Sequence, residues 1–339
     1  MEPILTFEDE KKTPKYLQVV NAVISAINKG KLNRGDQLSS INELSNEFFL
    51  ARDTVQKAYG ILLKKGVLCS VRGKGYYINR TDLHTSYKIL LVFNKISNYK
   101  KEVYNSFVQA IGDKGTVDLK IHNFNSKFFE SLIVNHLNDY DYFVVMPHFY
   151  DNHETVQKTF LKIPDAKLVI LDKDINDRFT NYSAVFQDFR LDVMEALEQG
   201  IESIKKYNKL IFVQPKVIPY PPEIALGFIN FCNQYQVPYE IIHEVEYSRQ
   251  LNKKEAYLVI EETDLVNLIN ACKQNQYKIG TDVGIISFND TPLKAILHDG
   301  ITVISTDHAK MGETAARLIL ENRREKIKNP FHFILRNSL

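Results

Sequence analysis

The sequence predicts an α/β protein in which a small N-terminal domain precedes a larger domain of two doubly wound lobes. Residues 1–80 contain three amphipathic helical stretches followed by two short extended ones, whereas residues 87–339 alternate short apolar strands with helical stretches. The length of 339 residues also favours more than one domain, because a single hydrophobic core rarely grows beyond about 250–300 residues. Residues 81–86 are polar and without periodicity, and we interpret them as the linker.

The three N-terminal helices are indicated by their apolar spacing and by the residues at their boundaries. An amphipathic stretch from Pro14 to Lys29 stops at Gly30. Ser40 and Glu43 have the S-x-x-E spacing of a capping box, which predicts that a second helix begins there. A third helix is predicted over residues 52–65, because its apolar residues recur at helical spacing. This inward stripe consists of Val55, Ala58, Tyr59, Leu62 and Leu63.

Two extended stretches, Val67–Val71 and Tyr76–Ile78, follow the third helix. Gly73 and Gly75 lie between them, and glycine permits the positive φ that a tight hairpin turn requires. Three helices followed by a β-hairpin within residues 14–78 describe a winged helix-turn-helix.

The net charge of +2 is unevenly distributed along the chain. Residues 1–86 hold nine Lys, four Arg and nine acidic residues, which gives this segment a net charge of +4, and the rest of the chain has a net charge of −2. A small basic segment beside a large, nearly neutral one indicates a module that binds a polyanion and a second module with a separate function.

The start of the third helix carries the residues that we expect to read DNA bases. A recognition helix presents its N-terminal residues to base edges in the major groove, and Arg52, Thr54 and Gln56 lie at or near this start. Arg pairs bidentately with guanine, and Gln pairs with adenine. Asp53 suits the positive end of the helix dipole and can accept a hydrogen bond from a cytosine amine.

Other residues of the same domain are placed to contact phosphates. Ser39, Ser40 and the backbone amides at the start of the second helix are natural phosphate anchors. Lys74 lies between Gly73 and Gly75 at the hairpin tip, where we expect it to follow the DNA backbone or to enter the minor groove.

Residues 14–79 resemble the DNA-binding domain of the GntR family of bacterial repressors. The resemblance rests on the segments KYLQV (15–19), GDQLSSINEL (35–44), ARDTVQKAY (51–59) and GKGYYI (73–78). The residues that it implies to contact DNA are Asn42, Arg52, Thr54, Gln56 and Gly73. Ser39 stands where the family usually has Pro, and Ala51 where it has Ser, which removes one expected phosphate or cap contact.

The larger domain, residues 87–339, shows repeated alternation of strands and helices. Short apolar runs without internal alternation are typical of parallel strands that are buried on both faces. Because about 250 residues are long for one such sheet, we expect two lobes with a cleft between them. Strands are expected at 89–93, 142–146, 168–171, 210–213, 257–260 and 283–288, and helices at 102–112, 126–138, 152–161, 189–206, 222–235, 263–275 and 308–323.

Doubly wound lobes bind their ligands at the carboxyl ends of the strands. The loops at these ends carry amide, carboxylate and guanidinium side chains with aromatic residues nearby, a set that suits a polyhydroxylated ligand because it offers paired hydrogen bonds and flat apolar faces. The effector-binding residues expected on this basis are Asn94, Ser97, Phe149, Asp188, Arg190, Tyr220, Glu223, Asp264, Asn289 and Asp290.

Residues 87–323 resemble the effector domain of lactose/galactose-type (LacI/GalR) repressors, which is itself similar to periplasmic sugar-binding proteins. The matching segments include YKILLVFN (87–94), VFQDFRLD (185–192), TDVGIISFND (281–290) and MGETAARLIL (311–320). The resemblance implies a periplasmic-binding-protein-like fold in which Asn289, Asp290 and Asp264 occupy ligand-contact positions. Ile224 stands where the family has a sugar-clamping Arg, and Asn289 where it has Asp.

The sequence gives no support to catalysis, and we predict that the protein is not an enzyme and uses no metal or cofactor. It contains no GxSxG elbow, Walker loop, HExxH or GxGxxG motif. The three cysteines are far apart and show no CxxC spacing, which argues against a zinc site. We interpret His148 and His153 as exposed loop histidines, and the acidic residues after one strand as ordinary loop residues; these are Asp172, Asp174 and Asp177.

The chain shows no apolar run that approaches the ~18 residues needed to span a bilayer and no secretory apolar region. We therefore expect a cytoplasmic protein without a membrane partner. The working hypothesis is a homodimeric transcriptional regulator, a repressor of carbohydrate-utilisation genes, which binds operator DNA and is switched allosterically by a monosaccharide between its lobes. The alternative is an enzyme or ligand carrier whose winged helix serves protein contacts.

Overall fold

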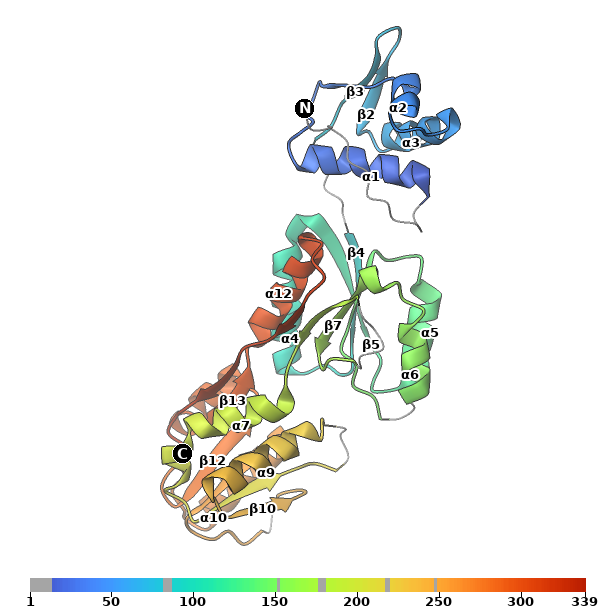
Figure 1. Cartoon of the computed structure of the whole chain (residues 1–339). Helices are drawn as coiled ribbons and strands as arrows, with labels where there is room; N and C mark the ends of the chain where they lie inside the picture. The colour runs from blue at the N-terminus through green and yellow to red at the C-terminus, as the bar shows by residue number, and fades with distance from the viewer. Residues whose placement is uncertain (1–13, 82–86, 151–152, 176–180, 217–219, 247–248) are drawn as a thin grey trace. The chain divides into compact units, whose positions relative to one another are not determined.

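The computed structural model describes residues 14–81, 87–150, 153–175, 181–216, 220–246 and 249–339. The chain forms two compact units, residues 1–85 and 86–339 (Figure 1). The predicted linker, residues 81–86, lies outside the described residues except for Thr81, as do Asp177 and the side chain of His153. No helix within the described ranges is long and apolar enough to cross a membrane.

The first unit is a winged helix-turn-helix, as predicted. Its three strands form an antiparallel sheet in the order β1-β3-β2. The two-residue strand β1 was not predicted, because it is defined by its pairing with β3 and has no periodicity of its own. The elements are α1 (Lys15–Asn28), β1 (Gln37–Leu38), α2 (Ile41–Glu47), α3 (Arg52–Lys64), β2 (Leu68–Val71) and β3 (Gly75–Ile78).

The predicted stripe of α3 forms the centre of the first unit's core. Val55 and Leu62 are fully buried, and the Tyr59 hydroxyl donates to the Ser39 carbonyl at 2.7 Å. The predicted capping box is also present. The Ser40 hydroxyl accepts from the Glu43 amide at 3.2 Å, while the Glu43 carboxylate accepts from the Ser40 amide at 2.7 Å.

The second unit contains two six-stranded sheets, which define an N-lobe and a C-lobe (Figure 1). The N-lobe sheet has the order β14-β8-β7-β6-β4-β5 and the C-lobe sheet the order β10-β9-β11-β12-β13-β15. The N-lobe strands are β4 (Tyr87–Phe93), β5 (Gly115–Ile121), β6 (Tyr142–Val145), β7 (Leu168–Asp172), β8 (Ser183–Phe186) and β14 (Lys326–Lys328). The C-lobe strands are β9 (Lys209–Val213), β10 (Tyr239–Ile242), β11 (Glu255–Val259), β12 (Val283–Phe288), β13 (Thr302–Thr306) and β15 (Phe331–Ile334).

Helices cover both faces of each sheet. In β4, Leu91 belongs to a core cluster with residues of α4 and α12, whereas its neighbour Leu90 belongs to a cluster with residues of α5 and α6. Both faces of a central strand are therefore buried, which confirms the doubly wound class. The helices are α4 (Asn98–Ile111), α5 (Ser126–His136), α6 (His153–Phe160), α7 (Phe189–Gln199), α8 (Ile201–Ile204), α9 (Glu223–Tyr235), α10 (Glu262–Gln274), α11 (Pro292–Ile296) and α12 (His308–Leu320), with short 3₁₀ turns at 112–114, 165–167 and 297–299.

The structure contains strands that the apolar runs in the sequence did not predict. Strand β5 alternates exposed and half-buried residues because it is an edge strand, so it has no continuous apolar run. Strands β8, β10, β13, β14 and β15 were likewise not predicted. The predicted helix 189–206 is in fact two helices, interrupted at Gly200. A Cβ on Gly200 would lie 2.3 Å from the Phe333 ring of β15, so the close approach of this strand requires glycine.

The described chain passes between the two lobes at three places, after β8, after β13 and after β14. Asn329, which is 1% exposed, joins these three crossovers. Its amide N–H donates to the Phe186 carbonyl at 2.8 Å, and its side-chain amide donates to Thr306 Oγ1 at 2.7 Å. These bonds hold the three segments together at the hinge between the lobes.

Candidate functional site

The exposed start of α3 carries the predicted base-reading residues. Arg52, Asp53 and Gln56 are exposed and Thr54 is half-buried, while the opposite face of the helix is packed in the core. Ala51 makes no side-chain cap for α3, as its replacement of the family's Ser implies. This end of the helix is therefore available to a partner, and base reading by these side chains remains a prediction.

The predicted phosphate-binding residues differ in how many of their hydrogen-bonding groups are already used within the domain. Ser40 uses both its amide and its hydroxyl oxygen in the capping box, so only its hydroxyl proton remains to donate to a phosphate. The Ser39 carbonyl accepts from Tyr59, and Asn42 is exposed. The Ser40 backbone amide, which we expected to bind phosphate, is thus occupied within the domain.

The hairpin tip has the geometry that its glycines predicted. Gly73 and Gly75 have φ of 77° and 105°. Gln37 Nε2 donates to the Lys74 carbonyl at 2.8 Å, which fixes the backbone of the tip to β1. The Lys74 side chain is exposed and makes no ion pair with any residue that the structure describes, so it is available to phosphates.

The second unit contains a pocket at the carboxyl ends of strands from both lobes. Asn94 follows β4, His148 follows β6, and Asp172 ends β7. The C-lobe contributes residues after β9 and β12. The lining consists of Asn94, Lys95, Tyr99, Lys100, Val103, Phe124, Met146, His148, Asp172, Gln187, Phe189, Tyr220, Pro221, Ile224, Phe288, Asn289, His308 and Met311.

Three of the ten predicted effector residues line this pocket: Asn94, Tyr220 and Asn289. Asn289 has a φ of 63°, and its carbonyl accepts from Lys294 Nζ at 2.8 Å, which stabilises the turn that presents its side chain. Ile224, which replaces the family's Arg, is 1% exposed and forms part of the apolar wall.

Four predicted residues lie outside the lining because they belong to helix starts. Ser97 and Asp188 are N-caps, which accept from the amides of Lys100 and Leu191. Glu223 is in the first turn of α9, and Arg190 is exposed on α7. A polar residue that follows a strand is often the cap of the next helix, and here this role replaces ligand contact for Ser97 and Asp188.

Two further predicted residues are engaged within the fold. The Asp264 carboxylate accepts from the Val245 amide at 2.8 Å and is buried. Phe149 stacks on the His122 ring at a centroid distance of 4.4 Å. Neither side chain lines the pocket.

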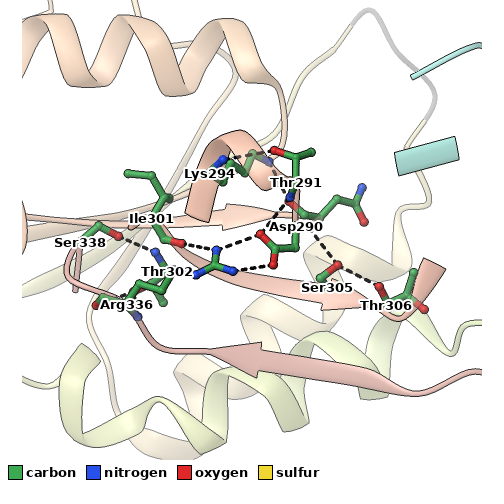
Figure 2. A network of polar contacts seen from close by, with 10 residues as sticks. Asp290, Thr291, Lys294, Ile301, Thr302, Ser305, Thr306, Arg336 and Ser338 are labelled. Atoms are coloured by element: carbon green, nitrogen blue, oxygen red, sulfur yellow. Dashed lines mark hydrogen bonds and ion pairs between the residues drawn. The ribbon is translucent and has the colours of Figure 1, made fainter. Parts of the chain in front are cut away.

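Asp290 forms a bidentate ion pair with Arg336, which Figure 2 shows at the centre of a polar network. The two Arg336 terminal nitrogens lie 2.8 and 2.6 Å from the Asp290 carboxylate oxygens. Arg336 also donates to the Ile301 carbonyl at 2.9 Å, and the Asp290 amide donates to Ser305 Oγ at 2.9 Å. The pair therefore fixes the C-terminal segment to the loop after β12, and Asp290 is absent from the pocket lining.

A buried polar cluster that sequence reasoning missed lies in the N-lobe wall. His148 is 8% exposed rather than an exposed loop histidine, and its Nε2 lies 2.8 Å from Asp172 Oδ2. Gln187 Nε2 donates to Asp172 Oδ1. Burial lowers the pKa of His148, which favours the neutral ring. Burial opposes ionisation of Asp172, but the hydrogen bond from His148 and the charge of Lys100 outweigh it and hold the pKa of Asp172 below its usual range.

Lys100, on α4, is a buried cation in the same wall. It is 4% exposed, and its Nζ donates to Asn94 Oδ1. Burial lowers the pKa of Lys100 to about 8. The sequence could have indicated Lys100, because it lies on the inward stripe of α4 with Val103 and Phe107. A charged residue at such a position is rarely placed there for packing alone.

Lys95 connects the two lobes at the pocket. It follows β4 of the N-lobe, and its Nζ lies 3.6 Å from Glu261 Oε1 of the C-lobe. It also donates to the Tyr220 hydroxyl at 3.4 Å, and this hydroxyl in turn donates to Glu261. Residues from both lobes thus form one polar connection beside the pocket.

Comparisons with known proteins identify the two units. Residues 15–78 match the model for bacterial regulatory proteins of the gntR family, and residues 205–338 match the model for the periplasmic binding protein-like domain. Over 92% of both chains, the protein is 20% identical to an arabinose metabolism transcriptional repressor from Geobacillus stearothermophilus. It is 28% identical to the HTH-type transcriptional repressor YtrA from Bacillus subtilis over 32% of this chain and 78% of that protein.

Solved structures match the second unit. The trehalose repressor from Escherichia coli has a TM-score of 0.61 at 12% identity, over 74% of this chain and 100% of that chain. A lac repressor dimer bound to operator has a TM-score of 0.60 at 12% identity, over 75% of this chain and 94% of that chain.

These matches define the class: the protein is a DNA-binding transcriptional regulator with a periplasmic-binding-protein-like domain. Within that class, it combines a gntR-family helix-turn-helix domain with a C-terminal domain that has the LacI-type fold.

Proposed function

We propose that this protein is a repressor of carbohydrate-utilisation genes whose affinity for operator DNA is switched by a monosaccharide or a derivative of one, bound in the pocket between the lobes. The observation that carries the proposal is the combination, in one chain, of an exposed recognition helix with a pocket lined by both lobes. The full-length similarity to an arabinose metabolism transcriptional repressor supports the link to sugars.

The pocket's composition fits a compact polyhydroxylated ligand. Phe189, Tyr220 and Phe288 offer flat apolar faces, and Asn94 and Asn289 offer amide donors and acceptors. Sites for small ligands characteristically combine apolar walls with a few placed polar groups.

The switch would follow from closure of the lobes. A ligand that contacts Asn94 in the N-lobe and Asn289 in the C-lobe binds most tightly when both lobes approach it, and the three crossovers at Asn329 provide the hinge. Because the DNA-binding domain precedes the N-lobe in the chain, we propose that reorientation of the N-lobe changes the placement of the DNA-binding domains in a homodimer. A coupling free energy of ~1–3 kcal/mol gives a 5–150-fold change in operator affinity.

The test begins with operator fragments selected from genomic DNA by the purified chain. Fluorescence anisotropy then measures operator affinity with and without each member of a sugar library, and light scattering measures the oligomeric state on and off DNA. We expect a dimer that binds one operator class with a nanomolar Kd and is released by one sugar class. If binding shows no sequence preference and no salt dependence, the winged helix serves protein contacts, and the enzyme or carrier alternative applies.

A further inference from the structure

Lys100 is a cation inside the pocket whose charge and N–H protons are only partly paired by other residues. It is 4% exposed and lines the cavity, and its one hydrogen bond among the described residues goes to the neutral side chain of Asn94. An ammonium group has three protons to donate, so two remain for another partner. A buried charge is costly unless a counterion and hydrogen bonds compensate it.

Asp172 is the acidic residue of the pocket lining, and each of its oxygens accepts a hydrogen bond from another residue. Oδ2 bonds to His148 and Oδ1 to Gln187, and the described residues show no ion pair between Asp172 and Lys100. Asp172 therefore attracts Lys100 through space without occupying its free protons. The other lysine of the lining, Lys95, is neutralised by Glu261.

A second polar group faces the same cavity without a protein partner. His308, at the start of α12, lines the pocket and is 6% exposed, and its ring makes no hydrogen bond with any described residue. Its ring packs on Tyr99 at a centroid distance of 5.0 Å, which holds its orientation. Burial lowers the pKa of His308 to about 4, so at neutral pH its neutral ring offers one donor and one acceptor.

We propose that the effector carries one anionic group, a carboxylate or a phosphate, which binds Lys100 together with His308 and the Asn94 amide, while its hydroxyl-bearing part lies between Phe189 and Asn289. This inference rests on the proposed function and specifies its ligand: a sugar acid or sugar phosphate instead of a neutral sugar. A bound anion would supply the counterion and acceptors that Lys100 lacks, and charge-assisted hydrogen bonds of this kind are about twice as strong as neutral ones.

The test compares matched compounds with the full chain by isothermal titration calorimetry. The panel contains neutral sugars, their aldonic acids and their monophosphates, built on arabinose, xylose and glucose, with inorganic phosphate as the anion alone. At pH 7 we expect at least one anionic compound to bind tenfold or more tightly than its neutral parent. Comparison of the acid with the phosphate decides which anion is used.

Lys100→Met is the decisive variant, and Lys101→Met, on the same helix, is its matched control. Lys100→Met removes the cation but keeps an unbranched side chain, and we expect it to abolish the preference for the anionic compound. Lys101→Met removes an exposed lysine that lies outside the pocket lining, so the preference should remain within twofold. Because Lys100→Met also removes the cation that favours ionised Asp172, we expect its melting temperature to fall, and binding is compared at a temperature at which both variants are folded.

The pH dependence gives an independent readout. Since the pKa of Lys100 lies at about 8, the preference for the anion should be full at pH 7 and decline as Lys100 loses its proton at alkaline pH. The nearby histidines have lowered pKa values and stay neutral over this range. The titratable groups that face Lys100 are Asp172, Lys95, His122, His148 and His308.

Three results would overturn the proposal. The neutral parents bind as tightly as their anionic forms, Lys100→Met loses equal affinity for the neutral and the anionic compound, or no anionic compound binds. Operator anisotropy on the same samples separates these failures from failure of the proposed function. If the chain binds its operator and a neutral sugar releases it, the repressor assignment stands and the anionic effector is wrong. If no operator is bound, the repressor assignment itself fails.

Discussion

The proposed DNA-reading surface and the pocket are built in opposite ways. Arg52, Asp53 and Gln56 stand on consecutive turns of one helix and are exposed, so their spacing is set by local backbone geometry. The polar residues of the pocket come from strand ends far apart in the sequence, and His148 and Lys100 are buried with partners of their own. We therefore expect substitutions on the proposed surface to change operator binding but not stability, and substitutions in the pocket to change both ligand binding and the free energy of unfolding.

The largest expected effect is on the pocket side of this comparison. Asp172→Ala removes the acceptor of His148 and Gln187 and an anion that attracts Lys100. We expect a loss of about 3 kcal/mol in the free energy of unfolding, because removal of one partner from a buried charged cluster leaves the others uncompensated. Urea denaturation of the second unit measures it.

Asp139→Ala is the control, because Asp139 pairs with His136 at 62% side-chain exposure and should cost less than 1 kcal/mol. Lowering the pH of the wild-type protein tests the stabilisation by Asp172 without a substitution. The pKa of Asp172 is lowered in the native state, so its stabilisation is complete above the unfolded value near pH 4 and is lost as the pH falls below it. Equal losses for the two variants would contradict the description of a buried cluster.

On the surface side, Arg52→Ala should weaken specific operator binding by about 1–3 kcal/mol, because a bidentate contact to guanine is lost. The melting temperature should not change, since the side chain is exposed. Lys74→Ala is the matched control: it should weaken all DNA sequences alike and reduce the slope of log K against log salt by about 0.9. If both variants bind operator DNA like the wild type, the proposal that these residues read DNA is wrong.

Asp264→Ala and Asn289→Gly test whether a polar residue at a strand end binds ligand or holds the fold. Asp264→Ala leaves the buried Val245 amide unpaired and should reduce the free energy of unfolding by about 1–2 kcal/mol. Asn289→Gly removes the side chain but accepts the φ of 63° without strain, so it should leave the free energy of unfolding within about 0.5 kcal/mol. It should instead reduce the thermal shift given by the tightest-binding compound of the sugar panel. If instead the Asp264 variant loses the thermal shift and the Asn289 variant loses stability, Asp264 binds the ligand and Asn289 holds the fold.

The smallest expected effect is at Phe49, in the turn between α2 and α3. This side chain is 96% exposed and its φ is 50°. Phe49→Gly should raise the free energy of unfolding by about 0.5–1 kcal/mol, because the left-handed conformation is strained for a residue with a Cβ and free for glycine. Phe49→Ala keeps the strain and should not stabilise. A fall in operator affinity in both variants would add Phe49 to the DNA-reading surface.

Prediction from sequence succeeded wherever neighbours along the chain decide the outcome. The Ser40–Glu43 capping box and the inward stripe of α3 depend on residues within one or two helical turns, and both are present. The apolar runs predicted the interior strands β4, β6, β7, β9, β11 and β12 but not the edge strand β5, in which exposed and half-buried residues alternate. They also did not predict the interior strands β8 and β13, in which Ser or Thr shortens the apolar run.

The same reasoning was weaker for the pocket. It located the strand ends, but the side chains there have three different uses: Asn289 faces the cavity, Asp188 caps a helix, and Asp290 pairs with Arg336. These uses are indistinguishable by residue type and position in the sequence. His148 was interpreted as an exposed loop residue because its partner, Asp172, lies 24 positions away.

By itself, the sequence determined the α/β class, the winged helix-turn-helix and the polar strand ends, because periodicity, capping and glycine turns are local properties. Only the tertiary structure decided which polar groups are satisfied within the fold and which are left for a ligand. That decision depends on partners brought together from distant segments, as Arg336 is to Asp290. Lys100 and His308 are left with unused hydrogen-bonding capacity in the pocket.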